Sequence, residues 1–146
     1  MKISTRARYA IRMILDIAAN SKNGEPVRLK ATAERQGLSK RYLEQLVIPL
    51  KNAAILRSVR GKEGGYKLAK HASEIKIGDI TSAVIGPINI IECIEYPDLC
   101  MKSTDCECRE IWSLINKKII DVLYEYSIED LINLKGKKIQ NGGLLI

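Results

Sequence analysis

Apolar side chains recur every three or four residues near the start of the chain, with polar side chains between them. This spacing predicts a helix that packs one stripe against a core and begins at Ser4 or Thr5, either of which can cap it. A polar turn at residues 21–26, which contains a glycine and a proline, ends the helix. The expected buried stripe consists of Tyr9, Ala10, Met13, Ile14, Ile17 and Ala18.

Two shorter apolar patterns follow, separated by a Gly-Leu-Ser turn. The first predicts a helix over residues 29–36 that ends at Gly37 in a left-handed cap. The second predicts a helix that begins at Ser39 and is kinked or ends early at Pro49, which has no backbone N–H to donate. This spacing is typical of a helix-turn-helix, whose second helix enters the major groove of DNA, and a plain helical hairpin is the alternative. The expected buried residues of the second helix are Leu43, Leu46, Val47 and Leu50.

Two short β-prone runs come directly after these helices, at residues 56–60 and 65–68. The turn between them is rich in glycine and carries Arg60 and Lys62. This pattern predicts a β-hairpin. A recognition helix followed by a basic hairpin is the arrangement of a winged helix-turn-helix, whose wing can insert an arginine into the minor groove.

The second half of the chain has a different pattern. Residues 77–85 predict one more short helix, which Gly86-Pro87 stops, and residues 88–105 are irregular and acidic. Apolar residues from Ile111 to Tyr126 then recur at steps of three and four, which predicts a long amphipathic helix. Its apolar face is broad for so small a chain, so we expect it to pair with the same helix of a second subunit, with packing on its own domain as the alternative.

Charge is distributed unevenly over the 146 residues, whose formal net charge is +7. Residues 1–76 carry 17 Lys and Arg against 6 Asp and Glu, whereas residues 77–146 carry 7 against 11. A basic half of this kind indicates a phosphate-backbone partner, because each neutralised phosphate releases condensed counterions. An anionic membrane surface, or a solvated basic surface without a partner, is the alternative.

Several classes of protein are disfavoured by what the residues lack. No apolar stretch is long enough to span a membrane and the first residues lack the pattern of a signal peptide, so we expect a cytoplasmic protein without a membrane partner. The sequence offers no Ser/His/Asp arrangement, no paired carboxylates and no phosphate-binding glycine loop. We therefore expect neither an enzyme nor a protein with a small-molecule substrate.

Four cysteines lie within sixteen residues. Without a signal peptide, clustered thiols more often bind metal or sense redox state than form disulfides. Structural zinc usually has two close pairs of ligands, and only one close pair is present, whereas iron–sulfur clusters accept thiolates on irregular loops. An iron–sulfur cluster is therefore favoured, and zinc, redox thiols or a chance grouping stay open. The four residues are Cys93, Cys100, Cys106 and Cys108.

Several short motifs of the chain occur together in one known family. They are MKIST at 1–5 with YA at 9–10, AERQG at 33–37, YLEQL at 42–46, and VRG at 59–61 with GGY at 64–66. On these motifs the chain resembles, over residues 1 to about 126, the Rrf-two (Rrf2) family of winged helix-turn-helix transcription regulators, and within it the iron–sulfur cluster regulators. The loop cysteines, followed by Arg109 and Trp112, also look like that family's three-cysteine sensor loop.

The resemblance implies a homodimer with domain-swapped long helices that binds a near-palindromic operator in double-stranded DNA. It also implies that Arg60 leads the wing into the minor groove. Gln45 can read adenine and Glu44 can accept from cytosine, and cations nearby can hold phosphates. The residues expected in the major groove are Ser39, Lys40, Arg41, Tyr42, Glu44 and Gln45, and those expected on phosphates are Arg28, Lys30, Lys40 and Lys62.

For the cysteine loop, the resemblance implies that Cys93, Cys100 and Cys106 are three ligands of a 2Fe-2S cluster. The iron–sulfur regulators have a histidine three residues after the third cysteine, where this chain has Arg109, whose guanidinium cannot ligate iron. Other members use a carboxylate from the partner's first helix, where this chain has Arg8. Cys108 is therefore the expected fourth ligand, with Glu107 or Glu110 behind it, and a spare thiol at Cys108 is the alternative.

These observations predict a mainly α fold with a small β-hairpin wing and a long dimerisation helix. We expect a winged helix-turn-helix DNA-binding domain over 1–76, a sensor loop and dimerisation helix over 77–135 and a flexible tail over 136–146. The expected function is a transcription regulator, a repressor of iron–sulfur assembly, iron or redox-response genes, that senses through a 2Fe-2S cluster. The alternatives are sensing of nitric oxide or of thiol redox state, or a metal-binding protein without a regulatory role.

Overall fold

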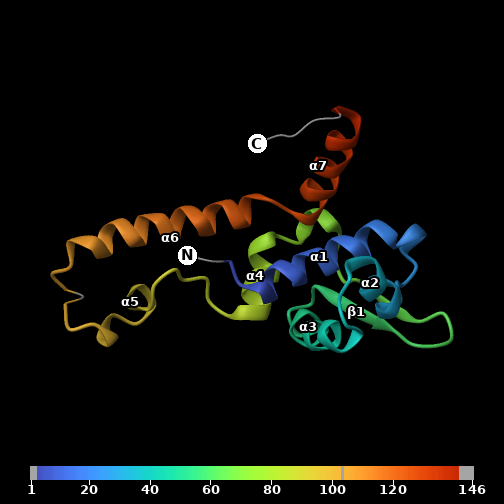
Figure 1. The fold of residues 1–146 in the computed structure, drawn as a ribbon, viewed down its shortest axis with the longest axis horizontal. Helices are drawn as coiled ribbons and strands as arrows, with labels where there is room; N and C mark the ends of the chain where they lie inside the picture. The colour runs from blue at the N-terminus through green and yellow to red at the C-terminus, as the bar shows by residue number, and fades with distance from the viewer. Residues whose placement is uncertain (1–2, 103, 142–146) are drawn as a thin grey trace.

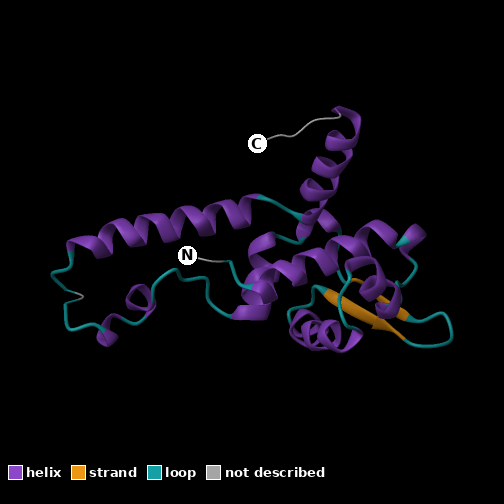
Figure 2. Cartoon of the chain, viewed as in Figure 1, coloured by secondary structure: helices purple, strands orange, loops and turns teal. Residues whose placement is uncertain are grey.

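The computed structural model describes the backbone of residues 3–102 and 104–141 (Figures 1 and 2). It is mainly helical with one two-stranded antiparallel hairpin, which confirms the expected fold class. In chain order the elements are α1 (Thr5–Asn20), η1 (Lys22–Gly24), α2 (Leu29–Gln36), α3 (Lys40–Asn52), β1 (Leu56–Val59), β2 (Gly65–Leu68), η2 (Ala72–Glu74), α4 (Ile77–Ile85), α5 (Glu92–Glu95), η3 (Pro97–Leu99), α6 (Glu107–Glu125) and α7 (Ile128–Asn141).

The turn between α2 and α3 has the caps that its sequence predicts. Gly37 adopts the left-handed conformation, with φ 64°, and the N–H of Leu38 donates to the carbonyl of Ala33 at 3.0 Å. Ser39 then caps α3, since its Oγ accepts the N–H of Tyr42 at 3.1 Å. The chain is thereby reversed between the two helices, and the stripe expected on α3 is buried in full.

Pro49 does not end α3, so the early end expected there is wrong. The helix continues to Asn52, and the carbonyl of Pro49 accepts the N–H of Ala53 at 3.0 Å. A proline at this position deprives the carbonyl of Gln45 of its helical donor. Gln45 lies on the exposed side of the helix, where water can satisfy that carbonyl.

The wing is a short hairpin in which Leu56 faces Leu68 and Val59 faces Gly65. A further pair of hydrogen bonds, each 2.8 Å, joins Tyr66 to Val27, so the hairpin is also held to the segment that precedes α2. Gly65 permits this close approach, because a Cβ at that position would lie 2.4 Å from the carbonyl oxygen of Val27.

The hydrophobic core lies between α1, α3 and α4, and the first turn of α7 closes it. Ile14, Leu46, Ile80 and Ile128, one residue from each of these helices, have no exposed surface. Residues on both sides of position 76 therefore share one core. The boundary at residue 76 between a DNA-binding domain and a sensing segment stays a prediction about function.

Residues 86–125 project from this core as an arm that ends with the long helix α6 (Figure 1). The loop expected at residues 88–105 contains two single-turn helices, α5 and η3. Asn116 is the one buried residue of α6, all of which the structure describes. Its Oδ1 accepts the N–H of Ile90 at 3.0 Å and its Nδ2 donates to Oδ1 of Asn89 at 3.3 Å. The buried amide of Asn116 thus joins two segments of the arm, residues 89–90 and α6.

Helix α7 is not predicted by the apolar pattern of the sequence. Ser127 begins it, because its N–H donates to Oδ2 of Asp130 at 2.8 Å and its Oγ accepts the N–H of Asp130 at 3.2 Å. Hydrogen bonds from Ser127 also lower the pKa of Asp130. Of the tail expected to be flexible, α7 includes the backbone up to Asn141, and the last five residues lie outside the described residues.

Candidate nucleic-acid interface and cysteine loop

Helix α3 presents a polar face on the side opposite its buried stripe. Because the buried positions recur at helical spacing, the residues between them face outward together. Tyr42 is half-buried, and Ile48 adds one apolar side chain that is 63% exposed. The exposed polar residues at the start of this face are Ser39, Lys40, Arg41, Glu44 and Gln45.

Two of these residues already pair with each other. Nζ of Lys40 lies 3.1 Å from Oε1 of Glu44, one helical turn along, and both side chains are about half exposed. Such an exposed pair contributes only about 0.3–0.5 kcal/mol. Lys40 can therefore exchange Glu44 for a phosphate, and Glu44 can exchange Lys40 for a base-edge donor, at small cost.

Arg60 and Lys62 are exposed in the turn of the wing, and Lys30 is exposed on α2. Arg28, at the start of α2, has a role within the protein that the sequence does not reveal. Its Nη2 donates to the carbonyl of Lys62 at 2.9 Å and to Oε2 of Glu63 at 3.1 Å. Arg28 therefore links α2 to the wing, and a phosphate would have to compete with Glu63 for it.

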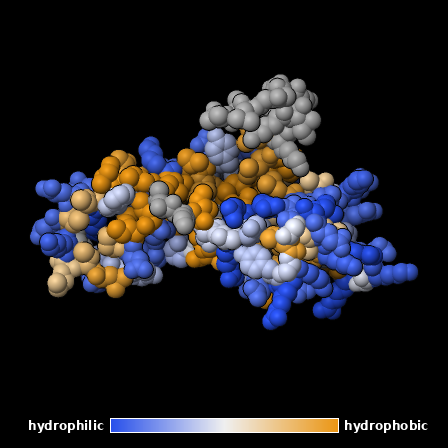
Figure 3. Space-filling model, in the orientation of Figure 1, coloured by the Kyte–Doolittle hydropathy of each residue, from blue (hydrophilic) through white to orange (hydrophobic). Residues whose placement is uncertain are grey.

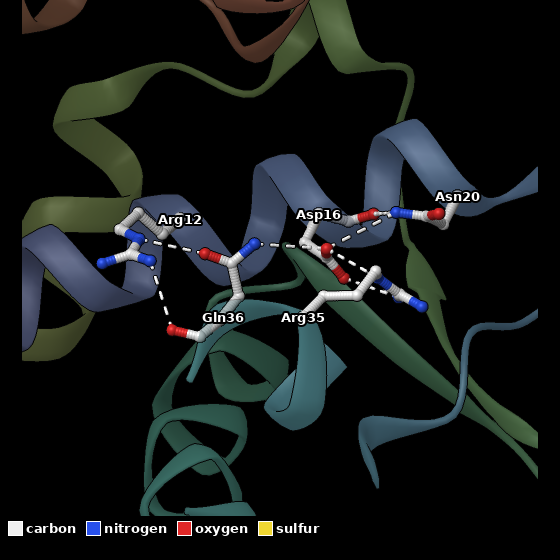
Figure 4. A network of polar contacts seen from close by, with 5 residues as sticks. All are labelled: Arg12, Asp16, Asn20, Arg35 and Gln36. Carbon is white, nitrogen blue, oxygen red and sulfur yellow. Dashed lines mark hydrogen bonds and ion pairs between the residues drawn. The ribbon is translucent and has the colours of Figure 1, made fainter. Parts of the chain in front are cut away.

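A buried carboxylate on α1, missed in the sequence, fixes the last turn of α2 (Figure 4). Asp16 is 7% exposed, and its Oδ1 and Oδ2 accept hydrogen bonds from Nε and Nη2 of Arg35 at 2.9 and 2.7 Å. Nε2 of Gln36 donates to the same Oδ1 at 3.2 Å. Burial opposes the charge of Asp16, but hydrogen bonds from Arg35 and Gln36 outweigh it and lower the pKa of the carboxyl, so Asp16 is ionised at neutral pH.

The cysteines occupy one end of the arm. Cys93 lies in α5, Cys100 directly follows η3, and Cys106 is the residue that caps α6, all three half-buried, whereas Cys108 is exposed in the first turn of α6. Cys93 and Cys100 line one hollow together with Ile91, Glu92 and Leu99. Two of the expected ligands are therefore brought to a common space.

Among the described residues, no group of three or more His, Cys, Asp or Glu side chains lies close enough together to hold a metal ion. The donor chemistry nevertheless fits an iron–sulfur centre, because two half-buried thiols line one hollow and two more follow at the start of α6. Arg109, in the first turn of α6, is half-buried and supplies no ligand.

Helix α6 presents a continuous apolar surface to solvent. Figure 3 shows hydrophobic residues along this helix and hydrophilic residues over the part of the molecule that precedes the arm, residues 3–85, which we call the winged part. A shallow groove runs along the helix and is lined by Leu114, Ile115, Lys118, Ile119, Val122 and Leu123. Leu114 and Val122 are 53% and 51% exposed, so the groove lacks a cover within the described chain.

No helix among the described residues has the length and apolar character needed to cross a membrane.

The fold and the polar face of α3 define a winged helix-turn-helix protein. The family model Rrf2, described as an iron-dependent transcriptional regulator, matches residues 3–134, and the chain belongs to this family of DNA-binding transcriptional regulators. Its matched relatives are transcriptional regulators, not enzymes.

Two curated relatives illustrate the range of the family. The transcriptional regulator CymR of Bacillus subtilis is 39% identical over 132 residues, which are 90% of this chain and 89% of that protein. The transcriptional regulator IscR of Pectobacterium atrosepticum is 36% identical over 135 residues, which are 92% of this chain and 81% of that protein.

The same two kinds of regulator occur among similar solved structures. The structure of CymR, the global cysteine regulator of B. subtilis, has a TM-score of 0.76 at 36% identity and covers 92% of this chain and 98% of its own. The structure of T. potens IscR has a TM-score of 0.75 at 32% identity and covers 100% of this chain and 93% of its own. The resemblance to the Rrf2 family is thus confirmed.

Proposed function

We propose that this regulator reads a near-palindromic DNA operator with α3 in the major groove and Arg60 of the wing in the minor groove. The observation that carries the proposal is that the exposed polar residues of α3 and the cations of the wing lie on the basic half of the chain. Ser39, Arg41 and Gln45 offer base-edge donors and acceptors. Lys30, Lys40 and Lys62 offer charges for phosphates, and Arg28 does so where Glu63 releases it.

The exposed apolar groove of α6 supports a homodimer. Apolar side chains that remain half-exposed on a long helix are stabilised by burial against a matching helix. A second copy of the chain supplies such a helix, and a dimer also supplies the second recognition helix that a palindromic operator requires. Dimerisation through α6 would supply two polar faces of α3, one for each half of the operator.

For the signal, we propose a 2Fe-2S cluster held by Cys93, Cys100, Cys106 and Cys108. The charge and redox state of the cluster would change with iron supply and oxidants. Through this signal, the chain would repress genes for iron–sulfur assembly, iron supply or redox response. The support is the grouping of all four thiols on the arm, the hollow that Cys93 and Cys100 share, and the similarity to IscR. When bound, the cluster supplies an anionic centre that forms or is lost with the redox state of the cell.

Anaerobic purification tests the cluster. Wild-type protein should be coloured, with about two iron and two sulfide per chain, and Cys100→Ala should be colourless with almost no iron. Cys108→Ala should retain less iron than wild type, because it removes the proposed fourth ligand. Full iron and colour in Cys100→Ala would remove this residue from the ligand set.

A second candidate is a regulator that responds to thiol chemistry without a cluster. The similarity to CymR, a cysteine regulator, favours it, as does the exposed thiol of Cys108. Anaerobic protein would then be colourless, and a thiol oxidant would change its affinity for duplex DNA until a reductant restored it.

A further inference from the structure

Helix α1 contacts the helix-turn-helix on both sides of its turn. On the α2 side, Asp16 holds Arg35 and Gln36 as described above. Arg12 adds two further bonds, because its Nε donates to Oε1 of Gln36 at 2.9 Å and its Nη2 donates to the carbonyl of Gln36 at 3.2 Å (Figure 4). Gln36 directly precedes Gly37, where the chain reverses, so α1 fixes the residue from which the turn departs.

On the α3 side, the contact is aromatic. The ring of Tyr9 meets the ring of Tyr42 edge to face, with centroids 6.0 Å apart and planes at 87°. The guanidinium carbons of Arg8 and Arg12 lie 5.0 and 5.4 Å from the centroid of Tyr9, which is within the range of a cation–π contact. The backbone N–H of Tyr42 is the group that Ser39 caps, so Tyr9 contacts the first turn of α3.

Arg12 belongs to both contacts. Its guanidinium binds Gln36 at the end of α2 and lies over Tyr9, whose ring touches Tyr42 at the start of α3. One side chain on α1 thereby connects the last residue before the turn with the first turn after it. We call this set of Tyr9, Arg12, Gln36 and Tyr42 the α1 bracket.

We propose that Tyr9 and Arg12 are positioning residues for sequence recognition, and that the α1 bracket sets the angle at which α3 presents its polar face. This inference rests on the proposed function of α3. Base-edge hydrogen bonds require placement to within about 0.5 Å and 10–20°, whereas phosphate contacts depend mainly on charge and tolerate small rotations. Loosening the bracket should therefore cost sequence discrimination and leave general affinity for DNA unchanged.

The test compares two duplexes, one that the wild-type chain selects from a random-sequence library and one of the same length and composition with scrambled order. Tyr9→Leu should weaken binding to the selected duplex about tenfold, and binding to the scrambled duplex by less than about twofold, with the same salt dependence. Tyr9→Phe keeps the ring and should bind both duplexes like wild type.

A charge-conserving pair separates positioning from phosphate binding. Arg12→Lys keeps the charge but cannot make both hydrogen bonds to Gln36 that the guanidinium makes. It should weaken binding to the selected duplex about threefold to tenfold. Arg6→Lys, at an exposed position of the same helix, is the matched control and should change neither affinity. In a Gln36→Leu background, Arg12→Lys should have a smaller effect on discrimination than in the wild-type background, because the bond from Nε of Arg12 to Oε1 of Gln36 is already absent and only the bond to the Gln36 carbonyl and the contact with Tyr9 remain to be lost.

Equal losses on both duplexes, or no loss on the selected duplex, would overturn the proposal. Thermal unfolding identifies any variant that fails to fold, and Arg12→Lys, an exposed substitution, decides the question if Tyr9→Leu is unstable. If the wild-type chain selects no duplex at all, the proposed function fails rather than the α1 bracket.

Discussion

The winged part of the molecule and the arm use their apolar residues in opposite ways. In the winged part, α1, α3 and α4 bury their stripes against one another, and side chains such as Ile14 and Leu46 have no contact with solvent. On the arm, α6 buries one asparagine and leaves residues such as Leu114 and Val122 about half exposed. The winged part buries its apolar residues within one chain, whereas the arm leaves apolar side chains and free thiols for which we propose a second copy and a cluster.

Charge divides the two regions in the same way. The first 76 residues are strongly basic, and residues 92–110 carry six Asp and Glu against two Lys and Arg. The basic region suits a polyanion such as DNA, and the acidic region would be repelled by it. The molecule thus separates the part that we propose to contact a duplex from the part that we propose to sense and to dimerise.

The largest effect is expected where the arm is incomplete. Leu114→Glu places a charge at one end of the exposed groove, where a partner helix would bury it twice, once in each subunit. The dimer dissociation constant should rise at least about 100-fold, since each buried leucine contributes about 1.5–3 kcal/mol. Analytical ultracentrifugation measures the change.

The matched control is Lys117→Glu, whose side chain is 73% exposed on the same helix and outside the groove. It should leave the dimer intact. A Leu114→Glu chain that stays dimeric would show that this groove of α6 is not the dimer interface. The proposal that a second copy buries the apolar side chains of the arm would then be wrong.

The next effect tests whether the winged part holds itself together. Asp16→Asn keeps the shape of the side chain but removes its charge, and it should lower the free energy of unfolding by about 1–3 kcal/mol, with the lower end favoured because solvent partly screens Arg35. The pKa of Asp16 is lowered in the folded state, so its stabilisation is present above pH 4 and is lost as the pH falls further. Urea unfolding should therefore show a larger difference in the free energy of unfolding between Asp16→Asn and wild type at pH 7 than at pH 3.

Asp121→Asn is the corresponding change on the arm. Asp121 pairs with Lys117 at 3.1 Å, one helical turn away, and both side chains are at least half exposed. Its loss should cost no more than about 0.5 kcal/mol at either pH. Equal costs for the two variants would mean that the buried carboxylate stabilises the winged part no more than a surface charge does.

A smaller effect is expected at the wing. Arg60→Ala should weaken binding to the selected duplex about tenfold and reduce the dependence of log affinity on log salt by about one, because one cation leaves the interface. Lys117→Ala removes a cation from the arm and should change neither quantity. Fluorescence anisotropy at several salt concentrations compares the two variants, and identical salt slopes would place Arg60 outside the interface.

The elements that the sequence predicts well are those defined by neighbouring residues. The stripe of α1, the glycine cap of α2, the serine cap of α3 and the hairpin each depend on residues within a few positions of one another. The structure has the two caps and the hairpin where expected, and it buries four of the six stripe residues of α1, with Tyr9 and Ala18 half-buried. Helix α7 follows the same local rules through Ser127 and Asp130, so a search for a serine followed three residues later by an acid would have found its start.

What the sequence does not reveal depends on residues far apart in the chain. Asp16 and Arg35 are nineteen positions apart, and Arg28 and Glu63 are thirty-five apart, so neither pair has a local pattern. The positions of the cysteines in space are equally hard to predict from the sequence. Their spacing indicates the kind of centre that they could hold, but not which thiols lie together. The structure brings Cys93 and Cys100 to one hollow, and the full ligand set stays a prediction.

The smallest effect concerns the joint between the two regions. A Cβ at Gly78 of α4 would lie 2.4 Å from the ring of Tyr124 of α6, so Gly78→Ala must push the ring away. Alanine gains about 1 kcal/mol over glycine in a helix, which offsets part of this clash. The net loss in the free energy of unfolding should be about 1 kcal/mol.

A double-mutant cycle separates the clash from the helical preference. With Tyr124→Leu in place, the ring is absent, and Gly78→Ala should become neutral or stabilising in the same urea unfolding experiment. The same cost in both backgrounds would mean that the ring of Tyr124 can move away from Gly78 without a cost in free energy. This contact would then not hold α6 to α4. The end of α6 would then be held to the start of α4 by the bond from the N–H of Ile77 to the carbonyl of Tyr126, at 3.0 Å, and by the bond from Nζ of Lys76 to the carbonyl of Glu125, at 3.3 Å, and the contact of Tyr124 with Gly78 would add nothing to that joint.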